Sequence, residues 1–283
     1  MTQPAQPHEQ HQPRVFGVAG TPAAVANSLS PRMMRAAFEA LDLDAYYVPL
    51  AIRERSASKA LRALPRLGFS GCNVTMPYKE TAAEVAATCS ELVERTGVAN
   101  TLVVRADGAL HAEATDGIAV AAAIRERGVE LADGGRVIVV GAGGAAMEAA
   151  LACIEAGARE IDIWNRTRSR AEELAARLQK LQPDLQLQVH DRMPIREPAQ
   201  VLLGCVPADA FDSRALDTLH EGTLVVDLAY RRDGRPTPLM AAVADRPERG
   251  VDGREILVRQ GAEAFRIWFD IAAPREVMTS AVR

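Results

Sequence analysis

The stretch RVIVVGAGGAA at residues 136–146 restricts the fold more than any other part of the chain. Four consecutive β-branched residues, 137–140, predict a strand that is apolar on both faces, as in a buried parallel sheet. Glycines follow at once, and an alanine-rich segment then predicts a helix that ends near Gly157. A buried strand that leads through a tight turn into a helix predicts an α/β fold with a parallel sheet.

The turn after this strand matches the dinucleotide-binding pattern G-x-G-x-x-A. Gly141 permits the tight turn, Gly143 lets the backbone approach a pyrophosphate, and Ala146 allows close packing of the helix. The N–H groups at the start of the helix can then bind the phosphates. A small-residue turn in another α/β fold is the alternative. The residues that we expect to bind a cofactor here are Gly141, Ala142, Gly143, Gly144 and Ala145.

The next predicted strand, 160–164, distinguishes between the two nicotinamide cofactors. An NAD site favours an acidic residue at the end of this strand, but Asp162 lies inside it. Arginines follow the strand instead, and guanidinium groups match phosphate geometry. We therefore predict NADP(H), with Arg166 and Arg170 at the 2′-phosphate; a solvated arginine run that caps the next helix is the alternative. The residues expected at this end of the cofactor are Asn165, Arg166, Thr167 and Arg170.

Strand and helix patterns alternate along the rest of the chain. Strands are expected at 15–19, 45–50, 71–76, 186–189, 201–205 and 223–228, and a hairpin with an Asp-Gly turn at 99–112. Helices are expected at about 30–40, 58–68, 77–87, 90–96, 168–181, 257–269 and 274–282, with Ser30 and Ser58 as N-caps. The polar residues 1–13 are typical of a disordered tail.

Composition excludes several classes of function. The net charge of −4 provides no basic surface for nucleic acid or for an anionic membrane. No apolar run is long enough to span a bilayer, and the N-terminus lacks the apolar core of a signal peptide. The four cysteines are far apart, which favours a reducing compartment. We therefore expect a cytoplasmic protein, a monomer or homodimer, with a small-molecule substrate and without a metal site.

Lys79 stands in an unusual place for a cation. Pro77 predicts the start of a helix, and the positive end of a helix dipole disfavours a positive charge in its first turn. With partial burial, this position predicts a lowered pKa for Lys79 and a role in proton exchange during carbonyl reduction. Asp116, after the hairpin, is the expected partner. A solvated helix lysine and a helix-capping aspartate are the alternatives.

The chain contains a series of short motifs, which are Ser28-x-Ser30-Pro31, Asn73-Val74-Thr75-x-Pro77-x-Lys79-Glu80, Val98-Ala99-Asn100-Thr101, Thr115-Asp116, Gly141-Ala-Gly-Gly-Ala145, Asn165-Arg166-Thr167, Tyr230, Thr237-Pro238-Leu239, and Gln260-Gly261-Ala262 with Phe265 and Trp268. Taken in order, these motifs resemble the shikimate dehydrogenase family over about residues 15–280.

This resemblance implies two α/β domains, a substrate-binding domain and a Rossmann-type NADP-binding domain with a doubly wound parallel sheet. We expect the substrate-binding domain at 14–116 and 251–283, and the NADP-binding domain at 117–250. The implied reaction is the NADP-dependent interconversion of shikimate and 3-dehydroshikimate in aromatic amino acid biosynthesis. By resemblance, Lys79 and Asp116 are the catalytic pair. The residues implied to bind the substrate are Ser28, Ser30, Thr75, Asn100, Tyr230 and Gln260.

The chain also departs from the family pattern, which indicates a divergent member. Ala114 stands where an asparagine is usual before the Thr-Asp pair, and Met147 replaces a usual arginine. Residues 203–209 (LGCVPAD) replace a usual Asn-Ala-Thr-x-x-Gly-Met loop beside the nicotinamide. Two alternatives therefore stay open: a quinate/shikimate or aminoshikimate dehydrogenase, and a ligand-binding paralogue without activity.

Overall fold

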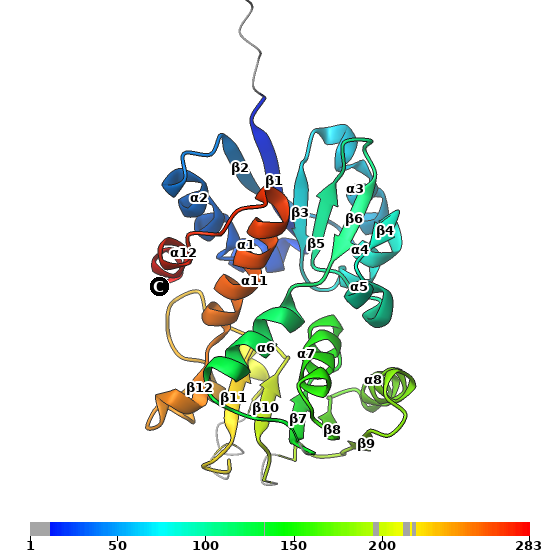
Figure 1. The fold of residues 1–283 in the computed structure, drawn as a ribbon, viewed down its shortest axis with the longest axis vertical. Helices are drawn as coiled ribbons and strands as arrows, with labels where there is room; N and C mark the ends of the chain where they lie inside the picture. The colour runs from blue at the N-terminus through cyan, green and yellow to red at the C-terminus, as the bar shows by residue number, and fades with distance from the viewer. Residues whose placement is uncertain (1–11, 133, 195–197, 212–215, 217–218) are drawn as a thin grey trace, which may run out of the picture.

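The computed structural model describes residues 12–132, 134–194, 198–211, 216 and 219–283, and it contains two six-stranded sheets (Figure 1). One sheet lies in the upper half of the molecule and the other in the lower half. Most of the expected tail, 1–11, lies outside the described residues. The mixed α/β architecture with two domains is therefore as predicted; the domain boundaries at 116/117 and 250/251 stay predictions.

The upper sheet is mixed, with the strand order β2-β1-β3-β5-β6-β4. β1 pairs with β2 and β3 in parallel, whereas β5 pairs with β3 and β6 in antiparallel orientation, so the expected hairpin is present. The strands are β1 Arg14–Gly20, β2 Ala45–Ala51, β3 Gly71–Val74, β4 Thr88–Cys89, β5 Thr101–Val104 and β6 Leu110–Glu113. The helices of this half are α1 Pro22–Asn27, α2 Ser30–Ala40, α3 Ala57–Ala63, α4 Lys79–Val85 and α5 Glu91–Thr96, with 3-10 turns at Glu54–Ser56 and Pro65–Leu67.

The lower sheet is parallel throughout, with the order β12-β11-β10-β7-β8-β9. Counted from β7, this is the doubly wound dinucleotide-binding order, and it reverses direction between β7 and β10. Ligands of such sheets bind where the order reverses, outside the carboxyl ends of the strands. The strands are β7 Arg136–Val140, β8 Glu160–Trp164, β9 Gln186–Val189, β10 Val201–Gly204, β11 Leu224–Asp227 and β12 Gly250–Val251. The helices and 3-10 turns of this half that the described residues define are α7 Gly144–Glu155, α8 Arg168–Leu181, Ala208–Ala210, α10 Pro238–Ala241 and Pro247–Arg249.

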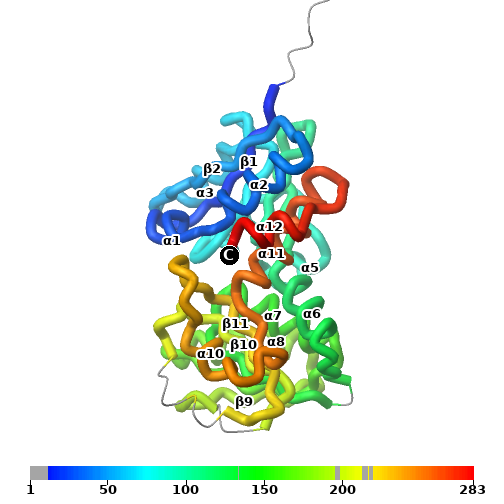
Figure 2. The backbone as a smooth tube through the Cα atoms, turned by 90° about the vertical axis from the view of Figure 1, so that its left-hand side faces the viewer, coloured from blue at the N-terminus to red at the C-terminus, as the bar shows by residue number. Residues whose placement is uncertain are grey.

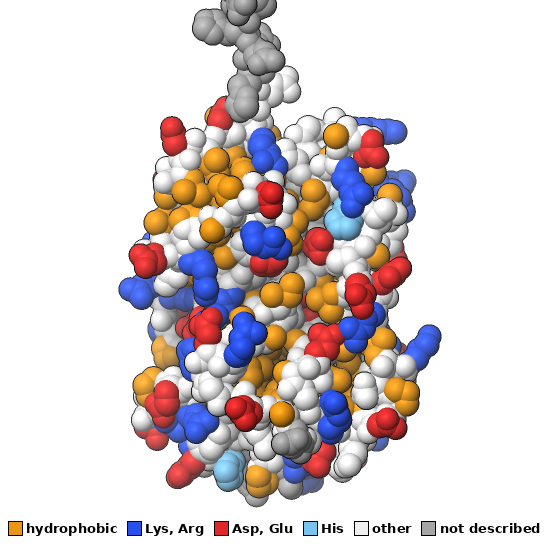
Figure 3. Space-filling model, in the orientation of Figure 1, with side chains coloured by type: hydrophobic (Ala, Val, Ile, Leu, Met, Phe, Trp, Pro, Cys, Tyr) orange, Lys and Arg blue, Asp and Glu red, His pale blue; other side chains and the backbone are white. Residues whose placement is uncertain are grey.

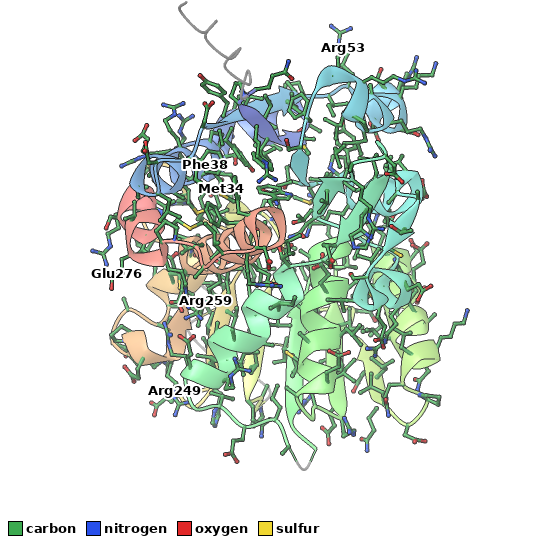
Figure 4. All side chains as sticks on the ribbon, turned by 45° about the horizontal axis from the view of Figure 1, so that its top comes forward. Met34, Phe38, Arg53, Arg249, Arg259 and Glu276 are labelled. Atoms are coloured by element: carbon green, nitrogen blue, oxygen red, sulfur yellow. The ribbon has the colours of Figure 1, made fainter. Side chains whose placement is uncertain are left out.

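Two helices run between the halves, α6 Asp116–Glu126 and α11 Gly253–Phe269, and α12 Arg275–Val282 then packs against α2 (Figure 2). Most of the apolar residues of α11 belong to the upper core, where Phe265 lies 6.1 Å from Phe38 between ring centroids. Met34 and Phe38 of α2 are part of the same core (Figure 4). The C-terminal helices therefore complete the hydrophobic core of the N-terminal half.

Several helix starts differ from the expectations. Ser30 is the first residue of α2 rather than its N-cap, and Ser58 lies inside α3, because the turns that begin both helices start earlier. α4 begins at Lys79 rather than Pro77, since a turn closed by the Tyr78 N–H to Thr75 carbonyl hydrogen bond (3.1 Å) precedes it. α11 begins at Gly253, four residues before its expected start, because Asp252 accepts hydrogen bonds from its first turn.

Charges of both signs are intermixed over the face shown in Figure 3. Within the described residues, no helix combines the length and the apolar character that a membrane crossing requires.

Candidate active site

A cavity of about 260 Å³ lies between the two halves, beside the carboxyl ends of β7 and β10. It is lined from below by Gly143, Gly144 and Ala145 of the glycine turn, and by Cys205 to Pro207 after β10. Every residue expected to act on or bind the substrate lines this same cavity. These residues are Ser28, Ser30, Thr75, Lys79, Asn100, Asp116, Tyr230 and Gln260. The structure therefore brings together side chains that are up to 232 positions apart in the sequence, from Ser28 to Gln260.

Lys79 is held by two carboxylates in this cavity. It is the first residue of α4 and is 8% exposed. Its ammonium forms an ion pair with Asp116, and it lies 3.3 Å from Glu148 Oε1. The sequence therefore predicted the partner Asp116, but not the second carboxylate.

The expected lowering of the Lys79 pKa is wrong. Burial does disfavour the ammonium, but the charges and hydrogen bonds of Asp116 and Glu148 outweigh burial and raise the pKa of Lys79. The helix dipole is a smaller effect than a direct ion pair in a buried site. Lys79 is thus protonated at neutral pH, and its ammonium can donate a hydrogen bond to a carbonyl oxygen.

Asp116 is also held from a third side. Asn100 Nδ2 donates to Asp116 Oδ1 at 2.7 Å, and to Thr115 Oγ1 at 2.9 Å. The Thr115 N–H in turn donates to Asn100 Oδ1 at 2.9 Å. This network orients the carboxylate beside Lys79 although Ala114 supplies no amide.

Tyr230 orders the loop that carries the two serines. The Leu29 N–H donates to the Tyr230 hydroxyl at 3.2 Å, and the Ser30 N–H donates to Ser28 Oγ at 3.2 Å. On the opposite side, Gln260 Nε2 donates to the Leu257 carbonyl at 2.9 Å and is thereby oriented. Hydroxyl, amide and phenol groups thus surround a space suited to a small polyhydroxylated acid.

The glycine turn has the features that a pyrophosphate requires. Gly141 has φ +118°, and a Cβ there would lie 2.7 Å from the Cys205 carbonyl oxygen, so only glycine fits. At Gly143 a Cβ would meet nothing within 4 Å, which leaves the backbone open to a ligand. Ala146 is fully buried in the lower core. A second cavity, of about 340 Å³, joins this turn to Arg170.

The arginines after β8 divide into paired and unpaired side chains. Arg168 forms ion pairs with Glu172 (2.8 Å) and with Asp191. Arg166 and Arg170 are exposed, and among the described residues neither side chain makes a hydrogen bond or ion pair. Asp162 is buried and pairs with Arg136 (2.6 Å), so its carboxylate is not free for a ribose.

The two cavities do not include all of the expected cofactor residues. Gly141, Asn165, Arg166 and Thr167 line neither of them, as far as the described chain extends. Asn165 Nδ2 instead donates to the Thr167 carbonyl at 2.8 Å and shapes the turn into α8.

Two residues of the site were not expected from the sequence. Asn73 lines the cavity, and its amide donates to Thr101 Oγ1 at 3.0 Å. Glu148 is fully buried in α7. Its signal was visible, since it is a lone charge within the apolar run AAMEAALAC at 145–153.

Known protein families match three segments of the chain, and these segments contain most of the residues that line the cavity. Residues 18–102 match the shikimate dehydrogenase substrate binding domain, residues 123–236 match shikimate / quinate 5-dehydrogenase, and residues 253–283 match the shikimate 5'-dehydrogenase C-terminal domain.

Individual proteins match over nearly the whole chain. The shikimate dehydrogenase (NADP(+)) of Rubrobacter xylanophilus is 37% identical over 280 residues, 94% of this chain and 95% of that protein. That of Paracoccus denitrificans is 35% identical over 275 residues, 93% of each chain. The shikimate 5-dehydrogenase of Thermus thermophilus, solved in complex with NADP(H) and shikimate, superposes with a TM-score of 0.78 at 29% identity, covering 95% of this chain and 98% of that one. This chain belongs to the shikimate dehydrogenase family.

Proposed function

We propose that this protein is an NADP-dependent shikimate dehydrogenase, an oxidoreductase that interconverts shikimate and 3-dehydroshikimate. The observation that carries the proposal is the shared cavity, in which the Lys79–Asp116 pair, six polar side chains and the glycine turn lie together. The names of relatives that match over nearly the whole chain support the same reaction.

In this proposal Lys79 moves the proton that accompanies hydride transfer. During reduction the protonated Lys79 donates to the carbonyl oxygen of 3-dehydroshikimate as that oxygen gains charge. During oxidation neutral Lys79 takes the proton of the shikimate hydroxyl, while the C–H bond breaks and its electron pair leaves with the hydrogen. Bound NADP⁺ would supply the acceptor for that hydride. Asp116 orients Lys79 and stabilises its charged form, and Asn100 holds Asp116.

The remaining residues of the cavity have binding roles. Ser28 and Ser30 hold the substrate carboxylate, while Thr75, Asn100 and Gln260 hold its hydroxyls and Tyr230 closes the pocket. The glycine turn would hold the pyrophosphate of NADP with the N–H groups at the start of α7. Arg166 and Arg170 would hold its 2′-phosphate, and their unpaired guanidinium groups, among the residues that the structure describes, support this assignment. Such a set of neutral donors and acceptors discriminates against substrates that leave one of them unpaired.

The test is the initial rate of oxidation of shikimate and of quinate, each with NADP and with NAD, followed by the absorbance of reduced nicotinamide. We expect fast turnover with shikimate and NADP alone. Turnover with quinate or NAD would instead place the enzyme in a catabolic role. A folded protein that binds NADP but turns over none of the four pairs would contradict the proposal and favour a ligand-binding paralogue.

A further inference from the structure

Glu148 is a charged residue of the site that the mechanism above leaves without a task. It lies in the second turn of α7, it has no exposed surface, and its helical neighbours are Met147 and Ala149. Among the described residues, the hydrogen bonds and the ion pair of its side chain all go to residues outside its own helix. A buried carboxylate of this kind costs stability unless it is paired.

One oxygen of Glu148 holds the start of α6. Glu148 Oε2 accepts the backbone N–H groups of Asp116 (3.1 Å) and Gly117 (3.4 Å), the first two residues of that helix. The side chain of Thr115, the N-cap, makes no hydrogen bond to the first turn of α6, so Glu148 satisfies donors that a helix leaves free at its start. The two helices touch here, since a Cβ on Gly117 would lie 2.8 Å from the Glu148 carbonyl oxygen.

The other oxygen of Glu148 faces Lys79. Glu148 Oε1 lies 3.3 Å from Lys79 Nζ, on α4 of the upper half. The charged groups in contact with Lys79 are thus Asp116 from α6 and Glu148 from α7. A single side chain on the helix after the glycine turn therefore contacts both members of the proposed catalytic pair.

We propose that Glu148 is a positioning residue that holds the Lys79–Asp116 pair from the cofactor-binding half of the molecule, an inference that rests on the proposed function of that pair. Its two oxygens have separate tasks: Oε2 fixes the backbone of Asp116, and Oε1 keeps the Lys79 ammonium in place and charged. Because α7 begins at the expected pyrophosphate site, cofactor binding and the geometry of the proton donor are linked through this side chain.

The charge states in the cluster support this role. Burial raises the pKa of Glu148 to about 7, with Lys79 opposing burial and Asp116 adding to it. Burial also disfavours the Lys79 ammonium, whereas Asp116 and then Glu148 raise the pKa of Lys79. Removing the Glu148 charge therefore lowers the pKa of Lys79.

Glu148→Gln separates the two tasks of the side chain. The amide oxygen of the new glutamine still accepts the N–H groups of Asp116 and Gly117. Its NH₂ group faces the Lys79 ammonium, so a hydrogen-bond donor stands where the carboxylate oxygen accepted. Glu155→Gln is the matched control, because Glu155 lies on the same helix with a half-exposed side chain and pairs with Arg95.

The pKa of Lys79 can be measured directly, because the chain has three lysines, Lys59, Lys79 and Lys180. In protein labelled with ¹³C at the lysine ε-carbons, we expect the pKa of Lys79 to fall by about 1 unit or more in Glu148→Gln. Glu155→Gln is expected to leave it unchanged. This titration needs no turnover, so it remains informative if shikimate is not the substrate.

Steady-state kinetics provide the second readout. In Glu148→Gln the acidic limb of the pH profile for shikimate oxidation moves to lower pH, since neutral Lys79 is available earlier. Because the Lys79 amine is no longer held in place, kcat falls about 10-fold or more, while KM for shikimate changes less than about 2-fold. An unchanged Lys79 pKa together with a wild-type pH profile would overturn the proposal. Inactivity of the wild type, with the Lys79 pKa still shifted in the variant, would contradict only the proposed substrate.

Discussion

The charge of Lys79 depends more on residues that are distant in the sequence than on its position at the start of a helix. A lysine at the first position of a helix is disfavoured by the helix dipole, which is worth about 0.3–1 kcal/mol at an exposed site. Two carboxylates that reach Lys79 from α6 and α7 reverse the direction of that effect. The helix start thus sets the position of the amine, and its charge is decided by residues 37 and 69 positions further along the chain.

Replacing Lys79 by alanine removes the proton carrier but leaves the polar lining of the cavity. We expect kcat of Lys79→Ala to fall about 10²- to 10⁴-fold, with KM for shikimate and Kd for NADP nearly unchanged. Lys180→Ala, on the exposed side of α8, is the control and should retain the wild-type rate. A Lys79→Ala enzyme with near wild-type turnover would remove Lys79 from the mechanism.

The arginines after β8 make a second prediction at the residue scale. Arg166→Ala and Arg170→Ala should each raise KM for NADP by about 10-fold or more, because each loses a charge-assisted contact with the 2′-phosphate. The weaker activity with NAD should not change. Arg168→Ala is a matched control, since Arg168 is already paired with Glu172 and Asp191. Equal losses with NADP and NAD would instead indicate a general effect on folding.

At the scale of elements, the unit β7–turn–α7 combines a buried strand with a closely packed turn. The strand is buried on both sides, and the turn passes directly beneath the loop after β10. Cys205 to Pro207 of that loop line the same cavity as Lys79, so the altered loop sequence LGCVPAD still contributes to the lining. The turn glycines therefore determine both the packing and the open space for a ligand.

Gly141→Ala tests this turn. The substitution forces an alanine into φ +118° and places its Cβ 2.7 Å from a backbone oxygen, so the backbone must move. We expect a loss of about 3 kcal/mol or more in the free energy of unfolding, measured with urea, and weaker NADP binding. Gly108→Ala also has a positive φ, of +79°, but open space around it, and should lose only about 1 kcal/mol. Equal losses in the two variants would show that contact with Cys205 is unimportant.

On the scale of the whole molecule, α6 and α11 connect the two sheets, and an ion network joins these helices to each other. Arg259 of α11 donates to both carboxylate oxygens of Glu126 (2.7 and 2.6 Å) and to Glu255 (2.6 Å). Its side chain is 8% exposed, and Figure 4 shows it at about mid-height, between the two halves. Arg127 adds a further pair with Glu255 at 2.8 Å.

Arg259→Ala should therefore destabilise the protein more than a surface substitution does. Loss of a largely buried guanidinium leaves two carboxylates without their shared partner, and we expect about 2 kcal/mol and a lower Tm. Arg266→Ala on the same helix removes an exposed pair with Glu263 and should cost less than about 0.5 kcal/mol. Similar Tm values for the two variants would contradict a role for Arg259 in joining the halves.

The same network has a pH dependence. Hydrogen bonds from Arg259 lower the pKa of Glu126 to about 2, against a partial opposing effect of burial. A carboxyl whose pKa is lowered by folding adds stability above its unfolded pKa of about 4.3, and that stability is lost as pH falls toward 2. The difference in unfolding free energy between wild type and Arg259→Ala should therefore shrink between about pH 4 and pH 2.

Local rules suffice for much of this protein. The buried strand at 136–140, the glycine turn, the Asp-Gly hairpin and the arginines after β8 each depend on a short run of neighbouring residues, and the structure has these elements where the sequence predicts them. The family motifs also predicted which side chains lie together in the cavity. Helix starts were less accurate, at Ser30, Ser58 and Pro77, because hydrogen bonds of the preceding turns decide them.

Tertiary structure decided the properties that depend on distant charges. The contact between Lys79 and Asp116, and with it the direction of the Lys79 pKa shift, requires the upper half to fold. The contact of Glu148 with Lys79 also requires the two halves to pack against each other. The strand patterns and turn residues of the sequence reflect interactions between residues that are close together in the chain. Electrostatic energies in a buried cavity depend instead on distance and desolvation, which exist only once the chain has folded.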